Sequence, residues 1–316
     1  MITNFFDVSE WEEHAYYGTG GTRNKVILEN PSDGKLYYFK TSLNKGQKNY
    51  IYEFWSEVIA SAIGAQLKFN ILMYDVAYRK DTLGCLSKSM LDTDKSQLDE
   101  GYKWIKRYWQ AYDTENREEY TFQIIDQTLS GFFPNHHFIN NIISTIIFDS
   151  IIGNEDRHQE NWGIIVSTQQ IEPVGLFSKK SLEQRTTYTF APMYDNGSSL
   201  GRELNDDKVS QMLMDNIQLT SYISRGQSEI HWAGVRGKQK HFDLISKIAE
   251  TNYKPIVLSV IDRIRSLYQE DIIENIIQHI DDCLPPHLES LKIPQNRKDL
   301  LIKLVILRVN RLLSLL

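Results

Sequence analysis

The sequence predicts an α+β protein with two lobes, in which a small β-rich lobe with one helix precedes a larger helical lobe. Three observations lead to this fold class. A chain of 316 residues exceeds the ~100–150 residues of a typical domain core. Short runs with strand-like patterning gather before residue 91, whereas apolar residues at helical spacing dominate after residue 101. We therefore assign residues 1–91 to the first lobe and residues 92–316 to the second.

In the first lobe, a hairpin is expected from two strands, 25–29 and 36–40, around a turn rich in Asn, Pro, Ser, Asp and Gly. A helix is expected over 50–64, where apolar residues form one stripe and Gly64 is expected to end the helix. Two more strands are expected over 69–79 and 83–90. The polar stretch 92–101 is the best candidate for a hinge between the lobes.

In the second lobe, the wide apolar stripe from Phe138 to Ile152 predicts a buried helix. A polar loop, 153–163, follows it. Short strands are expected at 164–166 and 188–190, with the polar residues between them forming a surface insertion. From Asp243 to the end the apolar spacing is again helical.

Composition narrows the classes of function. Hydrophobic residues make up 41% and charged residues 24%, which are values of globular proteins. The net charge of −6, from 35 basic and 41 acidic residues, argues against nucleic acid as the main partner, so no direct nucleic-acid contact is expected. The two cysteines are too few for a disulfide framework and suit a reducing compartment.

The two ends of the chain carry no strong targeting signal. The N-terminus has neither a basic segment nor an apolar segment of the secretory type, so we expect a cytoplasmic protein, while secretion is left open. The apolar tail from Leu300 is interrupted by Lys303, Arg308 and Arg311, which makes it a poor membrane span. We expect a packed C-terminal helix and no membrane partner; a helix lying on a membrane surface is the alternative.

A glycine-rich segment in the first lobe is suited to phosphate binding. Glycines lack a Cβ, so their backbone N–H groups can approach phosphates closely; the alternative is an ordinary turn. The candidate residues of this loop are Gly18, Thr19, Gly20, Gly21 and Thr22.

Lys40, at the end of a strand behind this loop, can hold phosphates as a compact positive charge, although an exposed edge-strand lysine is the alternative. Either Glu53 or Glu57 on the following helix could face Lys40. We prefer Glu57 and expect at least one of the two acids to be simply solvated.

Three oxygen-bearing residues of the second lobe form the strongest chemical pattern. Asp156 and Asn161 lie five residues apart in one loop, and Asp195 follows a later strand. Phosphoryl transfer needs this layout, because one carboxylate accepts the proton of the attacking hydroxyl while an Asn and a second Asp hold Mg²⁺. The alternative for Asp156 and Arg157 is a local ion pair or cap. For Arg157, neutralising a phosphate or an activation-segment carboxylate and a purely structural role are both open.

Two motifs in this region resemble those of the HipA-like serine/threonine kinases. They are Gly153-Asn-x-Asp-Arg-His-x-x-Asn-x-Gly163 and Ala191-Pro-x-Tyr-Asp-x-Gly-Ser-Ser199, and Lys40 and the segment Ser56-Glu57-Val-Ile-Ala60 precede them in the order of that family. The resemblance covers roughly residues 15–250. It implies a protein-kinase-like fold, ATP and Mg²⁺ as cofactors, Asp156 as catalytic base, Asn161 and Asp195 as Mg²⁺ ligands, and Lys40 on the ATP phosphates.

The resemblance also implies a biological role. The glycine-rich loop begins at Gly18, so the chain is similar to the short members of the family, the HipT-type and cell-translocating kinases. The implied partners are a protein substrate, with aminoacyl-tRNA synthetases as one class, and small antitoxin proteins. Thr19 and Thr22 are the hydroxyls placed for autophosphorylation of the loop, unless they only hydrogen-bond the turn. The alternative functions are a phosphoinositide or small-molecule kinase and a nucleotide-binding pseudokinase that holds a partner.

Overall fold

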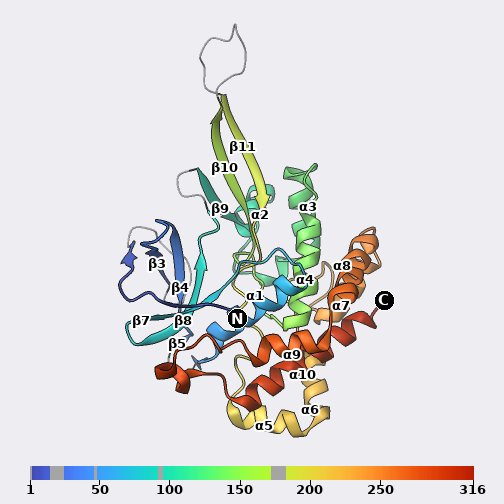
Figure 1. The fold of residues 1–316 in the computed structure, drawn as a ribbon. Helices are drawn as coiled ribbons and strands as arrows, with labels where there is room; N and C mark the ends of the chain where they lie inside the picture. Colours follow the sequence, from blue (N-terminus) through green and yellow to red (C-terminus); the bar gives the residue numbers. More distant parts are fainter. Residues whose placement is uncertain (1, 15–24, 46–47, 92–94, 172–182) are drawn as a thin grey trace.

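The computed structural model describes the whole chain except residues 1, 15–24, 46–47, 92–94 and 172–182. Figure 1 shows an N-terminal sheet beside a larger body of helices, with a long β ribbon projecting from the region between them. This mixed architecture confirms the predicted α+β fold class, with a small β-rich lobe and a larger helical lobe.

The N-terminal sheet has six strands in the order β1-β7-β8-β4-β3-β2. β1 runs parallel to β7, and every other neighbouring pair is antiparallel. The strands are β1 (Phe5–Asp7), β2 (Glu12–Glu13), β3 (Lys25–Glu29), β4 (Leu36–Lys40), β7 (Asp75–Arg79) and β8 (Thr82–Lys88). The hairpin predicted for residues 25–40 is therefore confirmed. A separate small ribbon contains β5 (Asn44–Lys45) and β6 (Lys48–Asn49).

The two faces of this sheet pack against different parts of the protein. One face buries a small apolar cluster of its own, made by Val8, Leu28, Phe39, Ala77 and Leu86. Side chains alternate between faces along a strand, and β3 and β4 pair with Lys25 opposite Lys40. Both lysines therefore lie on the opposite face, together with the buried Cys85, which is part of the main core.

Helix α1 (Glu53–Gln66) lies in this main core and begins three residues later than predicted. Gly64 does not end it, so that expectation was wrong. A Cβ at Gly64 would lie 2.8 Å from Cδ1 of Ile71. The glycine therefore allows the following segment to pack closely on the helix, which is a packing reason that the local sequence pattern does not reveal.

The second sheet has three antiparallel strands in the order β11-β10-β9. They are β9 (Ser96–Glu100), β10 (Gly163–Ile171) and β11 (Glu183–Phe190). The polar stretch expected to be a hinge thus supplies β9. Both β10 and β11 extend well into the polar stretch expected to be a surface insertion, where the paired strands project away from the body (Figure 1). Among the described side chains of this part, the consecutive residues Arg185, Thr186 and Thr187 are exposed, so both faces of the strand meet solvent and its sequence shows no apolar alternation.

The helical part is built around α4 (Ile139–Ile152), whose side chains are almost all buried, as predicted. It packs against α3, α7, α8 and α10. The other helices are α2 (Gly101–Tyr108), α3 (Phe122–Phe132), α5 (Asp206–Met214), α6 (Asn216–Arg225), α7 (His241–Ala249), α8 (Lys254–Leu267), α9 (Glu270–Gln278) and α10 (Gln295–Leu313).

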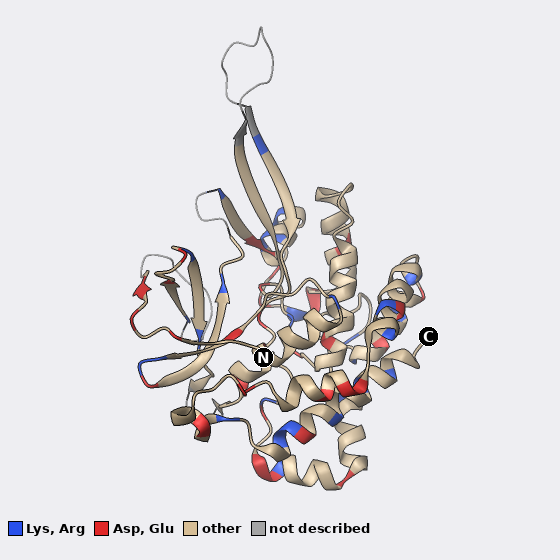
Figure 2. Cartoon of the chain, in the orientation of Figure 1, with Lys and Arg blue, Asp and Glu red and all other residues tan. Residues whose placement is uncertain are grey.

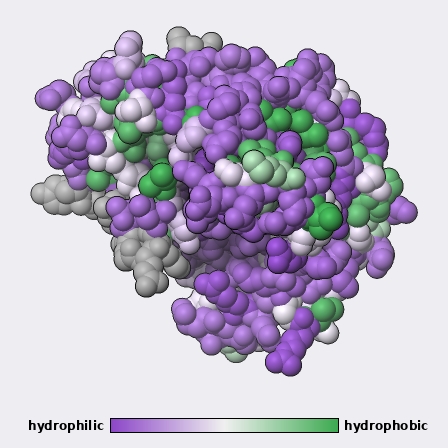
Figure 3. Space-filling model, turned by 90° about the horizontal axis from the view of Figure 1, so that it is seen from below, coloured by the Kyte–Doolittle hydropathy of each residue, from purple (hydrophilic) through white to green (hydrophobic). Residues whose placement is uncertain are grey.

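The C-terminal helix α10 is packed into the body, as expected, and buries Leu304, Val305 and Leu312. Across the described residues, the search for a helix with the length and apolarity of a membrane span finds none. The face seen in Figure 3 is mainly hydrophilic, and its apolar residues form separate patches.

The end of α4 is set by a glycine and a buried arginine. Gly153 adopts a left-handed conformation with φ of 66° directly after the helix. Arg308 of α10 donates a hydrogen bond to the carbonyl of Ile152 at 3.2 Å. A Cβ at Gly153 would lie 2.2 Å from Nη2 of Arg308. This contact fixes where the polar loop 153–163 leaves the helix.

We expect Gly153→Ala to lower the free energy of unfolding by more than the cost of placing an alanine in the left-handed conformation. The conformation costs about 1–2 kcal/mol for a residue with a Cβ, and the clash with Arg308 adds to it. Gly34→Ala is the matched control, because Gly34 has φ of 62° and a Cβ there would meet no atom within 4 Å. Urea unfolding of both variants measures the difference. Equal losses of unfolding free energy would contradict the role of Arg308.

Candidate active site

Lys40 joins two acidic groups from distant parts of the chain. Its ammonium group makes ion pairs with both Glu57 of α1 and Asp195. Glu57 is fully buried, and its second oxygen accepts a hydrogen bond from the backbone N–H of Asn196 at 2.7 Å. Burial raises the pKa of the Glu57 carboxyl, and the charge of Lys40 opposes this shift. The strand, the helix and the Asp195 segment are thereby held together.

The second acid of α1 is also buried, which corrects the expectation that one of the two is solvated. Glu53 pairs with Arg202 and accepts a hydrogen bond from the N–H of Leu43 at 2.8 Å. Its partners come from both sides because α1 lies between the N-terminal lobe and the segment after Asp195. The structure therefore places Glu57, the preferred residue, beside Lys40 and gives Glu53 a separate partner.

Asp156 and Asn161 contact each other within the polar loop. The Asn161 side-chain amide donates to the carbonyl of Asp156 at 2.8 Å, and the N–H of Asp156 donates to Oδ1 of Asn154 at 3.2 Å. The carboxylate of Asp156 accepts a hydrogen bond from the Ser198 hydroxyl at 3.0 Å. Because Ser198 lies three residues after Asp195, this bond connects the Asp156 loop to the Asp195 segment.

The side chain of Arg157 also connects the Asp156 loop to the Asp195 segment. Its guanidinium is 1% exposed and makes two hydrogen bonds to Asp149, at 2.8 and 3.0 Å. It also donates to the carbonyls of Asn161 and Tyr194 and to Oδ1 of Asn196. Tyr194 and Asn196 flank Asp195, which itself has a left-handed φ of 55°.

These contacts decide the open question about Arg157. Burial alone would lower the pKa of its guanidinium, but the charge and hydrogen bonds of Asp149 outweigh burial and raise this pKa. Within the described residues, the ion-pair partner of Arg157 is Asp149 rather than Asp156. Arg157 is therefore structural, and the local ion pair offered as the alternative for Asp156 is not formed.

Lys25 lies on the same face of the N-terminal sheet as Lys40. The two residues are opposite in the β3–β4 register, and Nζ of Lys25 lies 5.0 Å from the ring centroid of Tyr38. Burial lowers the pKa of Lys25, the charge of Asp195 opposes this shift, and the like charge of Lys40 adds to it. Two lysines beside an aspartate form a site that can neutralise a polyanion.

Sequence reasoning missed several residues that support the site. Asp149 had a usable signal, because it is the one charged residue in the apolar stretch 138–152, and a buried charge requires a partner. Asn154 and Ser198 stand in the two quoted motifs, but their residue types alone did not indicate which groups they would contact, and Asn196 had no signal at all. The predicted phosphate-binding residues Gly18, Thr19, Gly20, Gly21 and Thr22 lie outside the described residues.

The donor set fits a magnesium ion. The Asn161 amide nitrogen is committed to the Asp156 carbonyl, which leaves Oδ1 as the oxygen that can meet a cation. With a carboxylate oxygen of Asp195, this supplies two hard ligands, and Mg²⁺ usually takes the others from phosphates and water. The described residues contain no cluster of three or more His, Cys, Asp or Glu side chains that could bind a metal ion by themselves.

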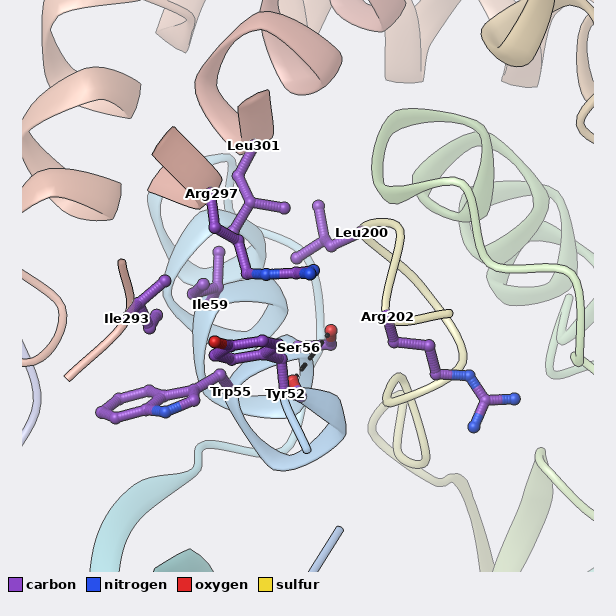
Figure 4. A pocket seen from close by; sticks show the side chains of 9 residues that line it. All are labelled: Tyr52, Trp55, Ser56, Ile59, Leu200, Arg202, Ile293, Arg297 and Leu301. Atoms are coloured by element: carbon purple, nitrogen blue, oxygen red, sulfur yellow. Dashed lines mark hydrogen bonds between the residues drawn. The ribbon is translucent and has the colours of Figure 1, made fainter. Parts of the chain in front are cut away.

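A small pocket lies behind this network, at the junction of α1, the segment after Asp195 and α10 (Figure 4). Arg297 of α10 reaches over it, with its guanidinium 4.0 Å from the Tyr52 ring centroid and Nη2 donating to the Leu204 carbonyl. The pocket therefore lies among residues that support the site rather than among the predicted site residues. Its lining consists of Tyr52, Trp55, Ser56, Ile59, Leu200, Arg202, Ile293, Arg297 and Leu301.

Comparison with known proteins identifies the fold. The chain matches no protein-family model and no curated protein sequence. Among solved structures it is similar to the proinflammatory kinase CtkA of Helicobacter pylori, with a TM-score of 0.75, 20% identity, and coverage of 99% of this chain and 96% of that one. It is also similar to HipA of a Shewanella oneidensis MR-1 toxin–antitoxin system, solved with HipB and operator DNA, with a TM-score of 0.51 and 12% identity over 97% of this chain and 67% of that one.

At these identities the comparisons establish the fold. They confirm the two-lobed kinase-like architecture and the structural resemblance to HipA-like kinases that the motifs predicted. The chemical roles of individual residues do not follow from the fold alone.

We expect Arg157→Leu to lower the free energy of unfolding by roughly 3–5 kcal/mol, because it leaves the Asp149 carboxylate buried without its partner. Adding Asp149→Leu should recover part of this loss. Arg265→Leu serves as the control, since the Arg265–Asp262 pair has side chains that are 49% and 65% exposed, and such pairs contribute about 0–1 kcal/mol. Urea unfolding checks all three, and a loss for Arg157→Leu no larger than the control would refute the assignment.

Proposed function

We propose that the protein is an ATP- and Mg²⁺-dependent protein kinase that phosphorylates serine or threonine. The observation that carries the proposal is the joined network in which Lys40 meets Glu57 and Asp195 while Asp156 contacts Asn161 and Ser198. Phosphoryl transfer leaves little covalent work for the protein, so catalysis rests on positioning and charge. This network offers both in one place.

Each residue has a definite task in this proposal. Lys40 and Lys25 bind the phosphates of ATP, and the glycine-rich loop 18–22 covers them. Asn161 and Asp195 would hold Mg²⁺, which when bound neutralises negative charge on the phosphates. Asp156 accepts the proton of the attacking hydroxyl, a contribution of about 10²–10⁴-fold to the rate. Glu57 holds Lys40 in place.

We further propose a role as the toxin of a bacterial toxin–antitoxin system, acting in the cytoplasm. The solved HipA structure comes from such a system and contains HipB. An aminoacyl-tRNA synthetase is the substrate class that the motif resemblance implies, and a small antitoxin protein is the implied partner. The loop residues Thr19 and Thr22 are the proposed autophosphorylation sites.

Charge distribution favours a protein substrate over an anionic lipid. Figure 2 shows Lys, Arg, Asp and Glu spread over both lobes, with both signs side by side on the C-terminal helices. Recognition of anionic headgroups relies on clustered basic residues. A pseudokinase is less well supported, because Lys40, Glu57, Asp156, Asn161 and Asp195 are all present and the Lys40–Glu57 pair is formed.

We expect the native protein to transfer labelled phosphate from ATP in the presence of Mg²⁺ and to lose this activity with EDTA. Asp156→Asn should lower the rate at least 100-fold while leaving ATP binding, measured by a thermal shift, nearly unchanged. Asp262→Asn, an exposed aspartate on α8, is the matched control and should behave as the native protein. Equal labelling by native protein and Asp156→Asn would remove Asp156 from its proposed role.

The products of the same reaction separate the alternatives. We expect label on protein, with mass spectrometry placing self-label on Thr19 or Thr22, and little label on phosphoinositide-containing vesicles. Label mainly on lipid would favour the lipid-kinase alternative. ATP binding without any phosphoryl transfer or ADP formation would favour the pseudokinase.

A further inference from the structure

The hydroxyl of Ser198 lies on the carboxylate proposed as the catalytic base. Its Oγ donates to Oδ2 of Asp156 at 3.0 Å, and both residues are only partly buried. Ser198 was absent from the predicted site. Its contact is specific, because the next residue, Ser199, is buried and instead donates to the carbonyl of Asn196 at 2.6 Å.

The orientation of the Asp156 carboxylate depends on this hydroxyl. Asn154 and Asn161 hold the backbone of Asp156 but do not touch its carboxylate. Among the described residues, Ser198 is the one side chain that hydrogen-bonds it, at Oδ2. The terminal torsion of an aspartate is broad, so an external hydrogen bond is needed to select one orientation.

Ser198 is itself held firmly on both sides. Before it, the N–H of Asn196 donates to Glu57 at 2.7 Å. After it, the carbonyl of Ser199 accepts from the Ser56 hydroxyl at 3.1 Å, and the N–H of Leu200 donates to the carbonyl of Ile152 at 2.9 Å. Two of these partners are on α1 and the third is at the end of α4. The position of the Ser198 hydroxyl thus reports whether α1 and the Asp195 segment are docked together.

We propose that Ser198 is a positioning residue that orients Asp156 and ties its orientation to the docked Asp195 segment, an inference that rests on the kinase function proposed above. With Oδ2 bound to Ser198, Oδ1 is the oxygen that faces the substrate hydroxyl and takes its proton. A base oriented by a third group is a common catalytic arrangement, and rigid support of this kind is what gives a site its precision.

Ser198→Ala should lower kcat for ADP formation about 10- to 100-fold, with casein as protein acceptor, while KM for ATP changes less than twofold. This is the range expected for losing a hydrogen bond to a charged group. Ser198→Thr, which restores a hydroxyl, should recover most of the rate. Ser198→Cys keeps the side-chain volume but donates weakly, so it tests the same point if the alanine variant folds poorly.

A double-mutant cycle gives the sharpest test, because a residue that acts only through Asp156 has no effect once Asp156 is disabled. Ser198→Ala should therefore add nothing to Asp156→Asn. The matched control is Ser130→Ala, since Ser130 also donates to an aspartate, Asp126, at 3.2 Å, but on the exposed surface of α3. That variant should keep the native kcat.

Three results would overturn the inference: native kcat in Ser198→Ala, the same fold loss in the Asp156→Asn background as in the native one, or phosphate mapped to Ser198 itself. The first two leave the kinase function standing, because native protein still turns over ATP. Failure of the native protein to form ADP would overturn both proposals, and so the two failures are distinguishable.

Discussion

A charged group buried in a protein needs its counter-charge inside the protein as well, and at this site the counter-charges lie on different structural elements. Glu57 of α1 meets Lys40 of β4, Glu53 meets Arg202, and Arg157 meets Asp149. Removing either member of such a pair leaves an uncompensated charge. The pairs can therefore form only when the strand, the helices and the two loops have all reached their native places.

This constraint gives α1 a central part in the fold. The helix packs its apolar side into the main core and sends both of its acids toward groups outside the helix. One acid reaches the lysine of the N-terminal sheet and the backbone beside Asp195; the other reaches the segment that follows. A shift of α1 would disturb Lys40 and the Asp195 segment together, so the two lobes share one set of supports.

The sequence predicted the parts of the site that have a local chemical signature. The residue types and order of Lys40, Asp156, Asn161 and Asp195 are those of phosphoryl transfer. In the structure Lys40 pairs with Asp195, Asn161 donates to Asp156, and Arg157 and Ser198 join the two loops. Their chemical roles belong to the proposal. The prediction that Glu57 rather than Glu53 contacts Lys40 was correct. The expectation that one of these two acids is solvated was wrong, because both are buried.

Other features could not be predicted because their causes are not local. Gly64 allows close approach not only by Ile71 but also by the ring of Phe148 on α4, which would lie 3.2 Å from a Cβ at this position, and the strand character of β9 depends on pairing with β10. The extended β10 and β11 lack an apolar face because they project into solvent. The hydrogen bond from Ser198 to Asp156 depends on the docking of a loop 42 residues away.

The pairing register of β10 and β11 affects the distance between Asn161 and Asp195. β10 begins at Gly163, two residues after Asn161, and β11 ends at Phe190, five residues before Asp195, with Ile164 opposite Phe190. Each residue of a strand advances about 3.3 Å. A slip of two residues between the strands, the smallest that keeps side chains on their faces, would displace Asp195 relative to Asn161 by ~7 Å. That displacement would exceed the span of the Mg²⁺ site proposed for Asn161 and Asp195, whose ligands would lie ~2.1 Å from the ion. The pairing register of the two strands therefore contributes, with Arg157, to the spacing of the residues they connect.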